Sequence, residues 1–167
     1  PVAVDVLTPP AAAVIANAAH AGLPTDRPVL AIGVEGTEST VAWQIEQLRR
    51  ELVPFGVQDL QTITSEAASP IWSALTEFQI PADDPITFQA NLRPSRAMEF
   101  LTMADASGVL AQCHSVNGLI VGHIPAEPGG GTPPLGTLKK LRDFARNTGG
   151  NLMVRHADES LSSRIDW

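Results

Sequence analysis

The feature that most constrains the fold is a pair of short apolar segments, residues 109–116 and 119–124, separated by Asn117-Gly118. Segments of this length are typical of β-strands, and Asn-Gly supplies the two positive φ angles that a type I′ turn requires. The sequence therefore predicts an antiparallel hairpin with a two-residue turn in the second half of the chain.

Strand and helix patterns flank this hairpin on both sides. Residues 86–92 alternate between apolar and polar, and Pro94-Ser95 begins a helix. After the hairpin, Thr132-Pro133 provides an N-cap and a first-turn proline, Gly149-Gly150 ends that helix, and residues 151–155 form a last strand. This order predicts a ferredoxin-like α+β sandwich, with both helices on one face of an antiparallel sheet.

Residues 1–26 are interpreted as a linker followed by an N-terminal helix. Residues 1–8 have the composition of a linker or an edge strand, and Pro9-Pro10 precedes an alanine-rich helix that ends near Ala21-Gly22. The weakly apolar face of this helix is expected to consist of Val14, Ile15 and Ala18.

Residues 27–167 are interpreted as one α+β domain without an internal boundary. The unbroken apolar run at 29–34 predicts a central strand, residues 38–52 have helical periodicity, and residues 57–63 are expected to form the next strand. Ser69-Pro70 begins a further short helix. This βαβ unit is expected to extend the ferredoxin-like sheet to about six strands, with helices on one face and the other face free.

Composition excludes several classes of partner. The 167-residue chain carries 11 basic and 18 acidic residues, and a net charge of −7 argues against binding to nucleic acid or to an anionic membrane. No apolar run approaches the roughly 20 residues of a transmembrane helix. Cys113 is the single cysteine, which suits a reducing, cytoplasmic location, and its strand parity predicts a buried, inert thiol.

The free face of the predicted sheet carries side chains that bind anions or a partner surface. Strand residues of one parity supply it, namely Thr87, Gln89, Asn91, Arg93, Gln112, His114, His123, Asn151, Met153 and Arg155. A merely solvated face is the alternative interpretation. His114 and His123 can be considered as metal ligands across the hairpin, but no carboxylate supports them, so a structural role is favoured. Residues 129–132 are interpreted as a loop, because they lack the lysine of a phosphate-binding loop.

Three stretches resemble a known family. They are Val34-Glu35-Gly36 followed by Val41-Ala42-Trp43-Gln44 and Leu48, then Asn91-Leu92-Arg93-Pro94-Ser95, and finally residues 138–167 with Gly149-Gly150-Asn151-Leu152, Arg164, Ile165 and Asp166. In this order they resemble the C-terminal cap domain of FAD-linked oxidases of the vanillyl-alcohol oxidase type. Within that family they are similar to the FAD-binding subunit of bacterial glycolate oxidase.

This resemblance implies a substrate-side cap in an enzyme that oxidises a small 2-hydroxy acid such as glycolate. In that family a separate N-terminal domain binds FAD, so the present sequence is expected to be an excised piece that retains no FAD and is inactive alone. The implied partners are the FAD-binding domain and other subunits of a glycolate oxidase complex, which would allow a peripheral place at the inner membrane. The family's histidine metal cluster has no matching motif here, so no metal is expected.

No catalytic residue is carried over from the family by motif, but the chemistry of a 2-hydroxy acid suggests roles for residues of the free face. Arg93, Arg155, Gln89, Asn91 and Gln112 are candidates for binding the substrate, and His114 is a candidate base for the hydroxyl proton. Two alternatives remain open at this point. The face could dock the flavin domain without contacting the substrate, or the chain could be a stand-alone ferredoxin-like module that binds a small effector or assembles without chemistry.

Overall fold

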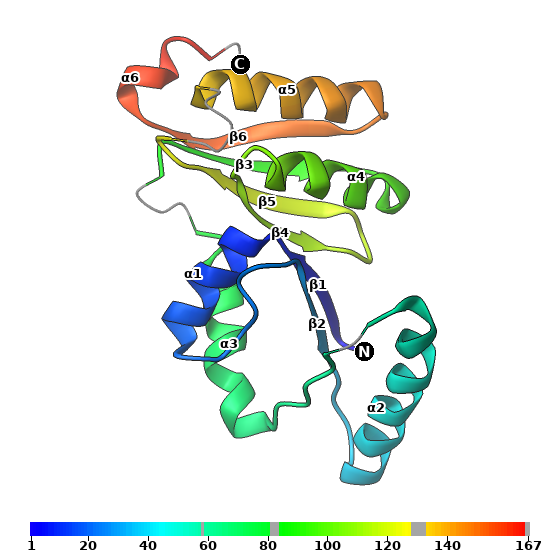
Figure 1. Ribbon diagram of the computed structural model, residues 1–167. Coiled ribbons are helices and arrows are strands. Elements are labelled where there is room, and N and C mark those ends of the chain that lie inside the picture. Colours follow the sequence, from blue (N-terminus) through cyan, green and yellow to red (C-terminus); the bar gives the residue numbers. More distant parts are fainter. Residues whose placement is uncertain (58, 81–83, 128–132, 166–167) are drawn as a thin grey trace.

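A computed structural model describes residues 1–57, 59–80, 84–127 and 133–165 of the chain (Figure 1). The elements in chain order are β1 (Ala3–Leu7), α1 (Pro9–Ala19), β2 (Val29–Gly33), α2 (Glu38–Leu52), the 3-10 helix η1 (Val53–Phe55), α3 (Ser65–Glu77), β3 (Ile86–Asn91), α4 (Pro94–Asp105), β4 (Leu110–His114), β5 (Leu119–Ile124), α5 (Pro134–Asn147), β6 (Asn151–Ala157) and α6 (Glu159–Ser162).

The strands form one six-stranded sheet in the order β2-β1-β4-β5-β3-β6, and every neighbouring pair is antiparallel. The second half of the chain supplies β4-β5-β3-β6 with α4 and α5 as the two crossovers, which is the ferredoxin-like arrangement. The predicted fold class is therefore confirmed. No helix in the described part of the chain is long and apolar enough to cross a membrane.

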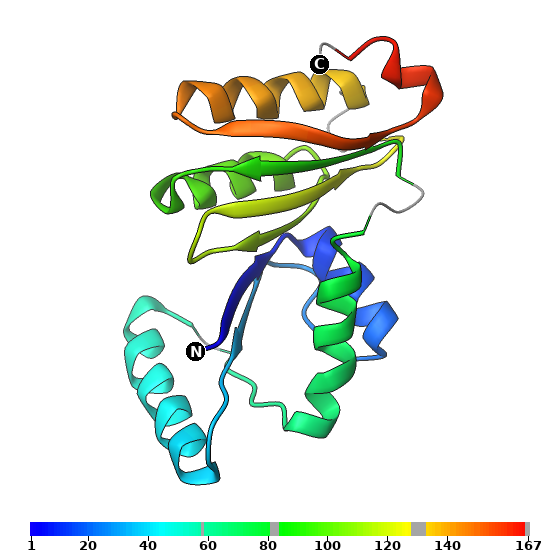
Figure 2. The same ribbon diagram turned by 180° about the vertical axis from the view of Figure 1, so that it is seen from behind.

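The main core lies between this half of the sheet and helices α4 and α5. Phe88 on β3 and Phe100 on α4 are both fully buried, and their rings meet edge to face with centroids 6.1 Å apart. Figures 1 and 2 show α4 and α5 along the same side of β3 and β6. The structure thus confirms the predicted position of these two helices.

The predicted hairpin is present, but its turn differs from the prediction. β4 and β5 are paired from His114 and Leu119 outwards, so the loop has four residues rather than two. Within it Gly118 alone has a positive φ, of 72°. The Asn117 side-chain oxygen accepts a hydrogen bond from the Leu119 backbone amide at 3.0 Å. This local bond holds the chain in a longer turn, so a type I′ turn is wrong.

The expected βαβ extension is present but is built from other residues. β1 pairs with β2 on one side and β4 on the other, so the interpretation of residues 1–8 as a linker or edge strand is wrong. β2 is the edge strand of the sheet, not a central one. Among residues 57–63, those that the structure describes are not in a strand. The inner place beside β4 is therefore filled by the N-terminal segment.

Helices α1 and α3 cover part of the opposite face of the sheet. Val6 belongs to the main core, whereas its neighbour Leu7 packs in a second cluster with residues of α1 and α3, and successive strand residues point to opposite faces. The expectation of helices on one face therefore holds only for the ferredoxin-like half. The predicted face of α1 is also incorrect, because Val14 is 45% exposed and the helix packs through small residues, namely Ala11, Ala12, Ala16 and Ala19, beside Ile15.

Helix α2 is separate from both cores. It has the expected bounds and apolar spacing, yet none of its residues is buried. Both views show it on the other side of the β1 and β2 pair from α1 and α3 (Figures 1 and 2). Trp43 on α2 is 63% exposed, and Phe55 in η1 is 86% exposed. The apolar side of α2 therefore has no partner among the described residues.

The single thiol should be unreactive in the folded protein. Cys113 is fully buried in the main core, as predicted, and burial, with a contribution from the Asp5 charge, raises the pKa of its thiol to about 11. Because the thiolate is the reacting form, we expect no reaction with a thiol-specific disulfide reagent at pH 8 in native buffer and full reaction in denaturant. Prompt stoichiometric labelling of the native protein would contradict this packing.

Candidate functional site

Six of the ten residues expected on one face lie together on it, in two rows across the strands. Gln89 pairs with Met153 on β6 and with Val121 on β5, and Val121 in turn pairs with Gln112. The second row contains Asn151, Asn91, Leu119, His114 and Asp5. The register deduced from the alternation of residues is therefore correct.

Only part of this face is open. The side chains toward α1 and α3 are buried, as is Thr87 on β3, whereas the other polar side chains of this face over β3 and β6 are not. Gln89 and Asn91 are half-buried, Asn151 and Arg155 are exposed, and Met153 is 50% exposed. Asn91 donates a hydrogen bond from Nδ2 to Oδ1 of Asn151 at 2.9 Å. We call the surface of Gln89, Asn91, Asn151, Met153 and Arg155 the open surface.

Gln112 is not part of the open surface. Its residue exposure is 1%, and among the described residues neither its amide oxygen nor its amide nitrogen has a hydrogen-bond partner. The expectation that Gln112 is exposed to substrate is therefore wrong. The reason is that the row it belongs to continues into Leu7, which is part of the second apolar cluster under α1 and α3.

His114 forms a close pair with Asp5, which sequence reasoning missed. The two residues lie directly opposite each other on β4 and β1, and Nδ1 of His114 is 2.6 Å from Oδ1 of Asp5. The Asp5 side chain is 5% exposed and that of His114 is 26% exposed. The hydrogen bond to Asp5 raises the pKa of His114, although burial opposes this effect. The signal for Asp5 was a charged residue within an apolar alternating segment at 3–7.

His123 has a structural role. Its Nε2 donates a hydrogen bond to the Phe78 carbonyl oxygen at 2.7 Å, and Nδ1 lies 3.3 Å from the Thr87 hydroxyl. The pairing of His123 with Leu110 places it at the other end of the β4 and β5 pair from His114, so the two imidazoles do not converge. Within the described ranges no three metal-ligating residues come together.

The two candidate arginines are separated. The Arg93 guanidinium lies against Gly149 in the turn between α5 and β6, outside the open surface. Arg155 sits at an irregularity in β6, because Val154 pairs with Phe88 and His156 already pairs with Thr87. Such β-bulges redirect side chains and are common beside binding sites. The bulge also gives His156 a position on this face that simple alternation did not predict.

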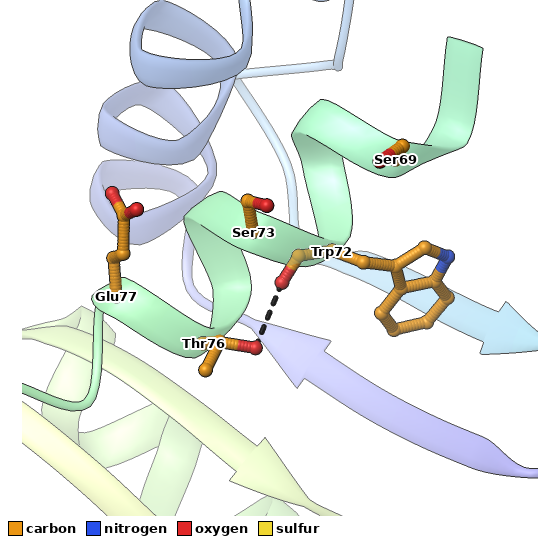
Figure 3. A pocket seen from close by; sticks show the side chains of 5 residues that line it. All are labelled: Ser69, Trp72, Ser73, Thr76 and Glu77. Atoms are coloured by element: carbon orange, nitrogen blue, oxygen red, sulfur yellow. Dashed lines mark hydrogen bonds between the residues drawn. The ribbon is translucent and has the colours of Figure 1, made fainter. Parts of the chain in front are cut away.

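The surface pockets do not coincide with the candidate site residues described above. One of about 350 Å³ is lined from a single helix, α3, by Ser69, Trp72, Ser73, Thr76 and Glu77 (Figure 3). Within it the Thr76 hydroxyl donates back to the Trp72 carbonyl oxygen at 2.9 Å. The Trp72 indole packs against Gly33 of β2. Trp72 and Thr76 are therefore engaged in the fold, and no ionisable pair converges on the hollow.

Comparison of the sequence with protein-family models and with curated proteins found no match. The glycine-rich residues 129–132, interpreted as a loop, lie outside the described part of the chain. The candidate site therefore consists of the open surface and of the Asp5 and His114 pair at its edge.

Proposed function

We propose that this chain is the substrate-side cap of an FAD-dependent enzyme that oxidises a small 2-hydroxy acid such as glycolate. One observation carries the proposal: a histidine supported by a buried carboxylate lies in the same cross-strand row as the amides of an open sheet surface. An imidazole held in this way is suited to proton transfer. The resemblance to the cap domains of FAD-linked oxidases supports the same proposal.

The cofactor would be held by a separate domain or subunit, since the resemblance assigns no FAD-binding residue to this chain. The open surface has the chemistry to face a planar ring, because it presents the Gln89 and Asn91 amides and the Met153 thioether from adjacent strands. FAD supplies an acceptor for the hydride that leaves the substrate carbon. The cap supplies the groups that bind and orient the acid and exclude water from it.

The residues of this chain have separate roles in binding the substrate and in accepting its proton. The amides of Gln89 and Asn91 bind and orient the substrate carboxylate, whereas Arg155, on the third strand from His114, is left to contact the FAD-binding domain. As the substrate C–H bond breaks, neutral His114 accepts the hydroxyl proton and a carbonyl group forms. The product is the corresponding 2-oxo acid, and the proton leaves His114 to solvent.

Removing the Asn91 amide tests the binding role. In the flavoprotein that contains this chain, Asn91→Ala should raise the apparent KM for the 2-hydroxy acid about tenfold, with little change in kcat, because the hydrogen bond from the amide to the substrate carboxylate is lost. Steady-state kinetics measures this effect. Asn147→Ala, a change at the exposed last residue of α5, is the matched control. An unchanged KM in Asn91→Ala would remove this residue from the substrate site.

A module that assembles without chemistry is the second candidate function, and α2 is the observation that favours it. An amphipathic helix with no buried residue and an exposed Trp43 suits contact with another protein. The two candidates differ in what His114 does. The assembly role predicts normal turnover after substitution of His114, whereas the cap role predicts a large loss.

A further inference from the structure

We infer that Asp5 is the positioning residue of His114, which it holds with Nδ1 protonated so that Nε2 is left to exchange a proton with a ligand on the open surface. The inference deepens the proposed function and rests on it for the identity of that ligand. The geometry of the pair itself is independent of any flavin, so it can be examined separately.

The contact geometry fixes which nitrogen carries the proton. An ionised carboxylate only accepts hydrogen bonds, so Nδ1 of His114 must donate across the 2.6 Å contact to Oδ1 of Asp5. In the neutral imidazole the second nitrogen then has a free lone pair. Among the described residues no hydrogen bond engages Nε2 of His114, in contrast to His123, whose Nε2 is bound to the Phe78 carbonyl oxygen.

The surroundings of Asp5 make the pair rigid. Its carboxylate is 5% exposed, and leaving such a group buried without a partner would be costly. The backbone beside it is also held, because both the amide and the hydroxyl of Ser115 donate to the Val4 carbonyl oxygen, at 3.0 and 3.1 Å. Residues next to Asp5 and next to His114 are therefore joined independently of the side-chain contact.

Asp5 is the ionisable group that faces His114 from the neighbouring elements. β1 has no other ionisable residue, and β5 presents Leu119 directly opposite His114, with His123 at its far end. The described turn that follows His114 contains Ser115, Val116, Asn117 and Gly118, none of which is ionisable. Cys113 points to the other face, where its raised pKa of about 11 keeps the thiol neutral.

Histidine NMR of the isotope-labelled chain tests the inference without any flavin. We expect neutral His114 to carry its proton on Nδ1, with that proton protected from solvent exchange. In Asp5→Asn the pKa of His114 should fall, because the charge that stabilises the imidazolium is removed. Asp158→Asn is the matched control, since Asp158 lies 3.8 Å from His156 on the surface and should leave His114 unchanged.

Two outcomes would overturn the inference: an Nε2-protonated neutral His114 in the wild-type chain, or a His114 pKa that is the same in Asp5→Asn. The wild-type tautomer alone decides the matter if the variant does not fold. In the flavoprotein, Asp5→Asn should also move the acidic limb of the kcat/KM profile to lower pH, by the same shift as in the NMR titration. Failure of the proposed function is distinguishable, because it would leave the tautomer and the titration unaffected.

Discussion

Replacing His114 by glutamine is expected to lower the turnover of the flavoprotein that contains this chain by about 100-fold or more, the usual contribution of a general base. Glutamine keeps a polar side chain of similar length but cannot accept and release a proton near neutral pH. Anaerobic mixing with excess 2-hydroxy acid, followed by flavin absorbance, measures the step in which the proton leaves. The loss should appear in the rate of flavin reduction and not only in the rate of product release.

The pH dependence of this effect has a defined sign. The hydrogen bond to Asp5 raises the pKa of His114, and only the neutral imidazole can act as the base. Wild-type kcat/KM should therefore rise with pH through that raised pKa, and His114→Gln should lack this limb. His20→Gln, at the exposed end of α1, is the control and should behave as the wild type does. Near-normal turnover in His114→Gln would leave the open surface as a docking surface.

The Asp5 and His114 pair also stabilises the fold, but in the lower pH range in which His114 is protonated and cannot act as a base. Because the folded-state pKa of His114 is raised above the ordinary histidine value of about 6.5, protonation favours the folded state. This contribution is fully present below the unfolded-state pKa and is lost as pH rises through the folded-state pKa. The pair therefore stabilises β1 against β4 most strongly where His114 is protonated, and it supports proton abstraction only where His114 is neutral.

The second half of the chain was predictable because its signals are local. Strand alternation at 86–92, proline at the start of α4 and glycines after α5 each act within a few residues. The tertiary arrangement then follows from the short connections and the order of the elements. The error in the hairpin turn is of the same local kind, since the Asn117 side chain bonds to the backbone instead of allowing its own φ to become positive.

The first half was less predictable because its pairing is distant in sequence. Asp5 and His114 are 109 positions apart, and nothing near residue 5 indicates that β1 joins the sheet beside β4. The same limit applies to the prediction of the site. Strand parity identified His114 as a candidate, whereas Asp5 was missed. Burial of Gln112 was missed as well, because the position of α1 and α3 over the second face could not be deduced from their own periodicity.

Helix α2 shows what a periodic pattern does and does not specify. Its apolar spacing correctly predicted a helix with bounds near 38–52, and Thr37 caps its first turn as its side chain accepts from the Thr40 amide. The pattern also indicates that one side of the helix favours an apolar neighbour. It does not identify that neighbour, and the described part of the chain buries no residue of α2.

A large loss of stability is expected from Gly122→Ala, because the close approach of β5 to the Phe88 ring leaves no room for a methyl group. A Cβ at Gly122 would lie 2.3 Å from Phe88 Cζ, and Phe88 is itself fully buried against Phe100. Overpacking of this kind should reduce the free energy of unfolding by about 3 kcal/mol, measured by urea denaturation followed by circular dichroism. Gly22→Ala is the control, since nothing lies within 4 Å of its added Cβ.

The double variant Gly122→Ala, Phe88→Leu replaces the ring by a smaller side chain. It should recover part of the lost free energy of unfolding, with a favourable coupling energy between the two sites. An unchanged urea midpoint in Gly122→Ala would mean that Phe88 does not lie over β5 in the folded protein.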